Sequence, residues 1–172
     1  MSRRDALLPL LAEQMLTHGL DMPLRPLADA VGTSDRMLLY YFETREELVA
    51  AVLGHLGQAF TQRLATAHPG GPAPSLHALS GLILDVARDP ALTRTVRVWF
   101  SLLSDPARRP LAAGIIAGYH EWLATALPDG ADPDAADALL AFVEGAIVLD
   151  AAGQSDRVDR ARAVLFPPPD AG

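Results

Sequence analysis

The sequence predicts an all-α protein whose two helical parts are joined by a long helix. Apolar residues recur at three- and four-residue steps along most of the chain, as they do on one face of an α-helix. Glycines, prolines and Asp-Pro steps separate these stretches, and no strand pattern with turn signals occurs. With 172 residues, 50% of them hydrophobic, the chain can bury a sizeable core.

The N-terminal part is predicted to contain three short helices. The stretch "RDALLPLLAEQMLTHG" carries leucine and methionine at helical spacing and stops at Gly19, a common C-terminal signal. The stretch "PLRPLADAVG" begins with two prolines, which a first turn tolerates, and stops at Gly32. Thr33 or Ser34 can then cap a third helix through "DRMLLYYF".

A long fourth helix is predicted from Arg45 to about Ala67. Thr44 and Glu47 match a T-x-x-E capping box at its start, and its apolar residues recur at four-residue spacing. After the break "HPGGPAPS" the helical pattern resumes. We expect five more helices, at about 75–88, 91–103, 107–127, 133–152 and 155–166, followed by a disordered tail over 167–172.

Three consecutive aromatic residues end the third predicted helix. Neighbouring side chains point in different directions around a helix, so at least one of Tyr40, Tyr41 and Phe42 must face away from the core. We expect Phe42 to face inward, with Leu38, Leu27, Val31, Leu11 and Met15. We expect Arg36, Met37, Tyr40 and Tyr41 to face outward. Two short helices joined by a tight Gly-containing turn are typical of a helix-turn-helix, whose second helix enters the DNA major groove.

Four features between about Arg4 and Leu53 occur together: Gly19 ending the first helix, then "LRPLADAVGTS", "RMLLYYF" and "TREEL". Together they resemble the TetR family of bacterial transcriptional regulators. The resemblance implies that Leu27, Ala28 and Gly32 are structural and that the third helix contacts DNA. The residues expected at the DNA interface are Arg25, Thr33, Ser34, Asp35, Arg36, Met37, Tyr40, Tyr41 and Arg45.

The chain departs from the family pattern in two places. Leu39 stands where the family usually has the first tyrosine of its aromatic group, and Leu10 and Leu11 replace small residues common in the first helix. The first departure falls at a position where the resemblance implies a phosphate contact.

The resemblance also implies a domain organisation and a function. Residues 1–53 would form a helix-turn-helix DNA-binding domain, and residues 54–166 a helical domain that dimerises and binds an effector. The protein would bind a palindromic operator as a homodimer, most often as a repressor, and leave it when an unknown small molecule binds. The expected pocket comprises Trp99, Phe100, Leu103, Ile116, Tyr119, Trp122 and Phe142, with His120 or Glu144 as its polar group. The same aromatic residues would suit an ordinary helical core.

The stretch from Ala138 to Ala152 is apolar almost all round, so one of its faces can pack on its own domain and another on a partner. With the last helix it could form a two-fold four-helix interface. The interface residues expected are Leu139, Phe142, Val143, Ala146, Ile147, Val158 and Leu165. The alternative is that this helix is buried within one subunit.

Charge limits how such a protein could hold DNA. The net charge is −7, and residues 1–55 carry five arginines against eight carboxylates, so no general basic patch is expected. Binding would depend on a few arginines and on helix N-termini, and salt would weaken it strongly. These features leave a helical protein–protein adaptor, with a helix-turn-helix shape but no operator binding, as the alternative.

Other function classes are less favoured. Without cysteine, no disulfide or thiolate metal site can form, and no apolar run is long enough to span a bilayer, so we expect a cytoplasmic protein. The side chains available for acid–base or metal chemistry are His77, Asp85, His120, Glu121, Glu144 and Asp150. Because metal-binding, phosphate-loop and nucleophile motifs are missing, we predict no catalytic residue, metal or cofactor.

Overall fold

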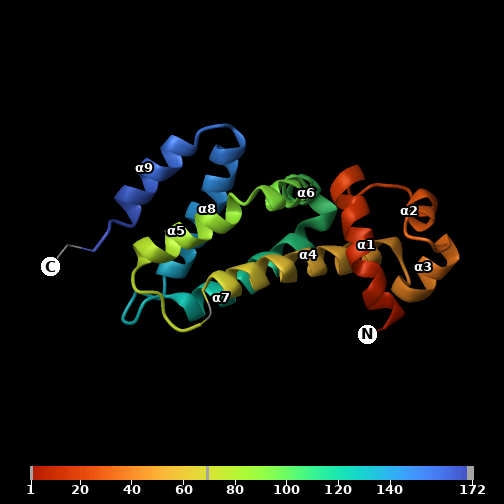
Figure 1. Cartoon of the computed structure of the whole chain (residues 1–172), viewed down its shortest axis with the longest axis horizontal. Coiled ribbons are helices and arrows are strands. Elements are labelled where there is room, and N and C mark those ends of the chain that lie inside the picture. The colour runs from red at the N-terminus through yellow and green to blue at the C-terminus, as the bar shows by residue number, and fades with distance from the viewer. Residues whose placement is uncertain (1, 69, 170–172) are drawn as a thin grey trace. The chain divides into compact units, whose positions relative to one another are not determined.

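The computed structural model describes residues 2–68 and 70–169, and it has the all-helical architecture that the sequence predicts (Figure 1). Within those residues there is no strand. The helices are α1 (Arg3–His18), α2 (Leu24–Ala30), α3 (Asp35–Phe42), α4 (Arg45–Ala67), α5 (Leu76–Ala87), α6 (Thr93–Ser104), α7 (Arg109–Ala126), α8 (Ala135–Ala151) and α9 (Ser155–Leu165).

The predicted boundaries hold to within about two residues, and the differences have a local cause. The helices predicted from 91 and 107 begin two residues later, because a 3₁₀ turn precedes each: η1 (Pro90–Leu92) and η2 (Pro106–Arg108). In both turns the aspartate before the proline accepts a hydrogen bond from a backbone N–H two residues on. Of the disordered tail predicted over 167–172, residues 170–172 lie outside the described residues, and residues 167–169 are not helical.

The chain divides into two compact units, and the first combines residues 1–60 with residues 93–115. The three N-terminal helices pack around one apolar core, in which Leu11, Met15, Leu27 and Leu38 are fully buried. The inner face predicted for α2 and α3 is therefore confirmed. Val98 and Leu102 of α6 and Ala112 of α7 complete this core.

The second unit combines residues 61–92 with residues 116–172. Its helices α5, α8 and α9 pack against one another, and the Ala73 N–H donates to the Ala126 carbonyl at 2.9 Å, which ties the segment before α5 to the end of α7. Leu79, Ile83 and Leu139 are fully buried in this unit. Within α9, Val158 alone is buried.

Helix α4 contributes to both units, since its residues up to Phe60 belong to the first and those from Thr61 to the second. None of the helices in the described residues is long and apolar enough to cross a membrane.

Candidate nucleic-acid interface

The turn between α2 and α3 is closed by backbone hydrogen bonds. The Thr33 N–H donates to the Ala28 carbonyl at 3.0 Å, and the Gly32 N–H donates to Asp29 at 3.2 Å. Gly32 has φ +70°, a conformation that glycine adopts without steric cost. The Ser34 hydroxyl then accepts a hydrogen bond from the Met37 N–H at 3.2 Å and caps α3. Of the two caps that the sequence left open, the structure uses Ser34.

Helix α3 has a buried face and an exposed face. Leu38 and Phe42 are buried in the core of the first unit, whereas Arg36 is exposed and Tyr40 is 75% exposed. The outward orientation predicted for Arg36, Met37 and Tyr40 is confirmed. Tyr41 instead lies half-buried against the core, with its ring edge-to-face with that of Tyr40 at 5.4 Å between centroids.

The other residues expected at the interface lie around α3. Arg25, Ser34 and Asp35 are exposed, and Thr33 is half-buried. Arg45, at the start of α4, is half-buried and donates through Nη2 to the Leu20 carbonyl at 3.0 Å. This bond ties α4 to the segment between α1 and α2 and leaves other N–H groups of the guanidinium for a second acceptor.

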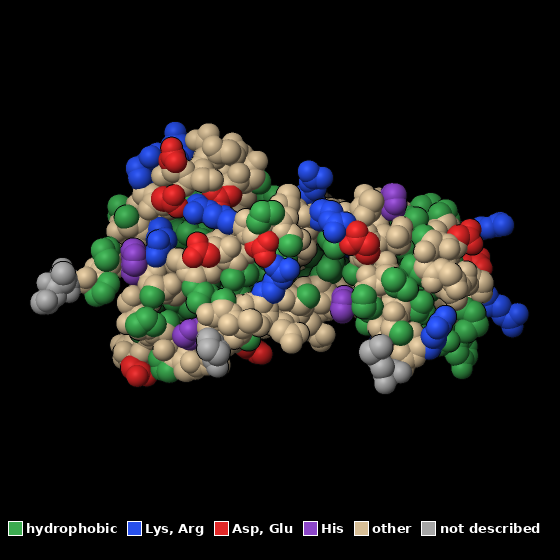
Figure 2. Space-filling view, in the orientation of Figure 1, with side chains coloured by type: hydrophobic (Ala, Val, Ile, Leu, Met, Phe, Trp, Pro, Cys, Tyr) green, Lys and Arg blue, Asp and Glu red, His purple; other side chains and the backbone are tan. Residues whose placement is uncertain are grey.

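The folded unit around the helix-turn-helix has a different net charge from the N-terminal segment alone. Residues 1–55 are acidic, but residues 93–115 join them in the first unit, which contains nine arginines and nine carboxylate side chains. Arg94 of α6 pairs with Glu13 and lowers the pKa of that carboxyl chiefly through its hydrogen bonds, and Arg108 pairs with Asp21. On the face drawn in Figure 2, basic and acidic side chains are interspersed and form no field of one sign.

Two features near α3, one exposed side chain and one contact, were not expected from the sequence. Leu39 is 40% exposed beside the buried Leu38, so it belongs to the outer surface of the helix. The Arg4 guanidinium lies 5.0 Å from the centre of the Phe42 ring, in the geometry of a cation–π contact. The position of Leu39 could have been derived from the helical period, because it lies about 100° from Leu38 around the helix.

Comparison with known proteins agrees with this geometry. No family model matches the sequence, and no curated protein does. Solved structures do match over nearly the whole chain. The multidrug binding protein EbrR in complex with malachite green is 25% identical, with 96% of each chain covered and a TM-score of 0.68. A Rhodococcus protein assigned to the TetR family of transcriptional regulators is 22% identical, with 95% of this chain and 94% of that chain covered and a TM-score of 0.72.

A third structure, a TetR-type transcriptional regulator from Streptomyces avermitilis, is 26% identical over 90% of this chain and 88% of its own, with a TM-score of 0.62. The chain has the TetR-family fold. The resemblance seen in the N-terminal motifs therefore extends, as a fold, through the C-terminal helices, where the sequence itself carries no family motif.

The residues predicted for an effector pocket fall in both units. The first unit contains Trp99, Phe100 and Leu103. The second unit contains Ile116, Tyr119, His120, Trp122 and Phe142. In the second unit the aromatic rings make packing contacts. The rings of Tyr119 and Trp122 stack at 6.0 Å, and those of Phe142 and Phe166 meet edge-to-face at 5.2 Å. Burial raises the pKa of Tyr119, and the charge of Glu144 raises it further.

An open cleft of about 910 Å³ lies elsewhere in the second unit. It is lined by the last turns of α4, by α5 and by α9, and none of the predicted pocket residues lines it. His120, one of the two predicted polar groups of the pocket, lies 3.2 Å from an Asp137 carboxylate oxygen.

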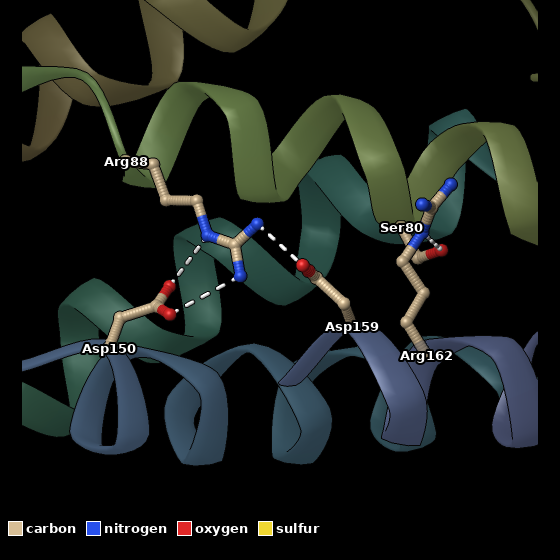
Figure 3. Close-up of polar contacts among 5 residues, drawn as sticks. All are labelled: Ser80, Arg88, Asp150, Asp159 and Arg162. Carbon is tan, nitrogen blue, oxygen red and sulfur yellow. Dashed lines mark hydrogen bonds and ion pairs between the residues drawn. The ribbon is translucent and has the colours of Figure 1, made fainter. Parts of the chain in front are cut away.

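Two arginines tie α9 and α8 to α5 (Figure 3). Arg88, at the C-terminal end of α5, donates to both oxygens of Asp150 at 2.8 and 3.2 Å and to Asp159 at 3.0 Å. Arg162 of α9 donates to the Ser80 hydroxyl at 3.0 Å and to the His77 carbonyl at 2.7 Å. Sequence patterns gave no signal for this network, because its members lie between 62 and 85 residues apart along the chain.

The predicted dimer residues need a correction. Five of the seven residues expected at the dimer interface are buried by their own chain, so they belong to the core of the second unit and offer little surface to a partner. These five are Leu139, Phe142, Val143, Ala146 and Val158. The other side of α8 stays exposed, at Ala138, Ala141, Gly145 and Val148, so one face of this helix packs on its own unit and another is open to solvent. Ile147 is half-buried and Leu165 is exposed. Val148 and Val164 are further exposed apolar residues on α8 and α9.

The side chains considered for catalysis are dispersed. His77 contacts the Phe166 carbonyl, His120 contacts Asp137, and Asp150 contacts Arg88. In the part of the chain that the structure describes, no three His, Asp or Glu side chains gather as a metal site would require.

Proposed function

We propose that this chain is a transcriptional regulator that binds duplex DNA through α3. The observation that carries the proposal is the division of α3 into a buried face, with Leu38 and Phe42, and an outer face, with Arg36 and Tyr40. An arginine can bind guanine O6 and N7 together, and a tyrosine hydroxyl can bind a phosphate oxygen. The capped, closed turn before α3 fixes the direction in which these side chains project.

We further propose that the regulator is a homodimer that represses its target genes. Two copies would place their α3 helices in successive major grooves, about 34 Å apart, on a palindromic operator. Exposed apolar residues on α8 and α9, namely Val148, Val164 and Leu165, support a contact between the second units of two copies. The functional division at residue 53 stays a prediction.

A small-molecule effector is the third part of the proposal. The similar structure of EbrR contains malachite green in one complex and imidazole in another. Because α4 runs through both units, an effector held by the second unit could act on the first through this helix. Such an effector shifts the protein between two states only by its different affinity for them.

Selection of duplexes from a random pool by the purified protein tests the DNA-binding proposal. We expect enrichment of an inverted repeat, with affinity that falls as salt rises. Arg36→Ala should weaken binding about 5- to 150-fold, which corresponds to the 1–3 kcal/mol of a bidentate base contact. Arg160→Ala, which removes an exposed arginine of α9, is the matched control and should leave affinity within about two-fold.

A folded dimer that enriches no duplex, even at low salt, would contradict the proposal and favour the adaptor. Malachite green is the first effector probe, because a similar structure holds it. Release of the selected operator on addition of the dye, with no loss of helical circular dichroism, is the expected sign of an effector response.

A further inference from the structure

The outer face of α3 is more apolar than base recognition through hydrogen bonds alone would require. Around the helix, at about 100° per residue, Arg36 and Tyr40 lie opposite the buried pair Leu38 and Phe42. Met37 and Leu39 lie on the two flanks of that outer face, 37% and 40% exposed. One cation, one phenol and two aliphatic side chains therefore make up most of the surface that would enter a groove.

This set of side chains limits which bases the helix can distinguish. The helix "DRMLLYYF" contains no asparagine or glutamine, the residues that bind adenine N6 and N7 together. Arg36 suits guanine. Among the remaining base features of the major groove, the one that attracts an aliphatic side chain is the C5-methyl group of thymine. Met37 and Leu39 match that group in chemistry.

The charges of the first unit make DNA a better occupant of this surface than an apolar protein partner. Arg36 is exposed in the middle of the outer face, and among the described residues no carboxylate pairs with its guanidinium. An apolar partner would have to bury that cation, at a cost, whereas a base edge or a phosphate would pair with it.

The balanced charge of this unit, nine arginines against nine carboxylates, gives it little general attraction for phosphate. Contacts to bases must then supply a larger share of the affinity.

We propose that Met37 and Leu39 recognise thymine C5-methyl groups next to a guanine that Arg36 binds, so that each half-site combines guanine with thymine. This inference rests on the proposed function. It assigns a role to Leu39, the position at which the chain departs from the family's tyrosine. There the aliphatic side chain replaces a phosphate contact with a base contact.

Replacement of thymine by deoxyuridine in the selected operator tests the proposal, because deoxyuridine keeps the base pair and the backbone and removes only the methyl group. For the unaltered protein we expect a loss of about three- to five-fold in affinity at one or more thymines in each half-site. Leu39→Ala or Met37→Ala should bind the thymine operator more weakly and should no longer distinguish thymine from deoxyuridine at its own position.

Leu10→Ala is the matched control, since Leu10 is an exposed leucine of α1, outside the helix-turn-helix, and its variant should keep the full deoxyuridine penalty. Circular dichroism checks that each variant is folded. If the selected operator is bound with dependence on Arg36, but deoxyuridine costs less than two-fold at every position, the proposal is overturned and the regulator function stands. The same holds if both α3 variants keep the full penalty. Failure to select any duplex would overturn the proposed function and this inference together.

Discussion

Helices α3 and α9 are both short and amphipathic, yet they are attached to the protein by different forces. Helix α3 is anchored by two fully buried apolar side chains, Leu38 and Phe42. Helix α9 itself buries Val158 alone, with Phe166 packed on Phe142 just after its end, and it is also attached through hydrogen bonds and ion pairs of Arg88 and Arg162. Two buried apolar side chains one turn apart, as in α3, hold a helix in place and leave its other faces free for a ligand; we call them an apolar anchor.

Ion pairs and hydrogen bonds, as in α9, occupy side chains on the helix surface and depend on the charge of those side chains; we call them a polar anchor.

The two anchors should differ in strength. Complete burial of a leucine or phenylalanine contributes about 1.5–3 kcal/mol, and this contribution does not depend on pH. A hydrogen bond to a charged group contributes about 1.5–3 kcal/mol when it is shielded from water, and less when its members are exposed. Asp159 is exposed, so its pair with Arg88 is screened by solvent. The sharpest tests of the comparison therefore begin with α3.

The largest effect is expected for Leu38→Ala. Removal of a fully buried leucine leaves a cavity and should cost about 2–5 kcal/mol of unfolding free energy, whereas Leu39→Ala on the same helix should stay within about 0.5 kcal/mol. Each unit contains one of the two tryptophans, Trp99 and Trp122, so urea unfolding followed by fluorescence in a Trp122→Phe background reports on the first unit. Equal losses for the two leucines would show that α3 has no preferred buried face.

The buried face of α3 could be predicted because it depends on local rules. A helical period places Leu38 and Phe42 on one side, and a glycine with a following serine predicts the turn and the cap. The same rules gave the helices of the second unit to within about two residues. Helical period and capping depend only on residues that are close in sequence, so they can be recognised directly from the chain.

Packing between distant segments could not be predicted in this way. The sequence did not reveal that Val98 and Leu102 complete the core of the N-terminal helices, or that Arg94 and Arg108 neutralise carboxylates there. It also could not decide how much of α8 its own unit covers, because an apolar helix suits a core and an interface equally well. The proposed DNA contacts, the effector pocket and the dimer surface remain predictions for the same reason, since each depends on a partner.

A smaller, pH-dependent effect is expected for the polar anchor. Burial raises the pKa of Asp150, but hydrogen bonds from Arg88 and Ser155 and the charge of Arg88 outweigh burial and leave this pKa below its ordinary value. A lowered carboxyl pKa adds stability that is present above the unfolded pKa of about 3.9 and is lost as pH falls through the folded pKa. Arg88→Ala should lower the unfolding free energy by about 1 kcal/mol near pH 7, and by less at about pH 3.

Fluorescence of Trp122 in a Trp99→Phe background follows this unit during urea unfolding at the two pH values. Arg160→Ala, on the exposed side of α9, is the control and should change neither value by more than about 0.5 kcal/mol. A loss for Arg88→Ala that is as large at about pH 3 as near pH 7 would mean that packing, and not the pair with Asp150, attaches these helices.

The smallest effect, and the most diagnostic of how α9 is attached, is expected at Gly81. Alanine is about 1 kcal/mol more favourable than glycine inside a helix, so Gly81→Ala should by itself stabilise α5. A Cβ at this position would lie 2.5 Å from Arg162 Nη2, however, so the guanidinium must move away from Ser80 and the His77 carbonyl. In a protein that keeps Arg162, the gain in helix stability and the loss of these hydrogen bonds should nearly cancel.

In an Arg162→Ala background there is no guanidinium to displace, and the same substitution should stabilise the second unit by about 1 kcal/mol. This difference between backgrounds measures the coupling of Arg162 to α5 directly, and an identical change in both would show that its hydrogen bonds contribute nothing to holding α9.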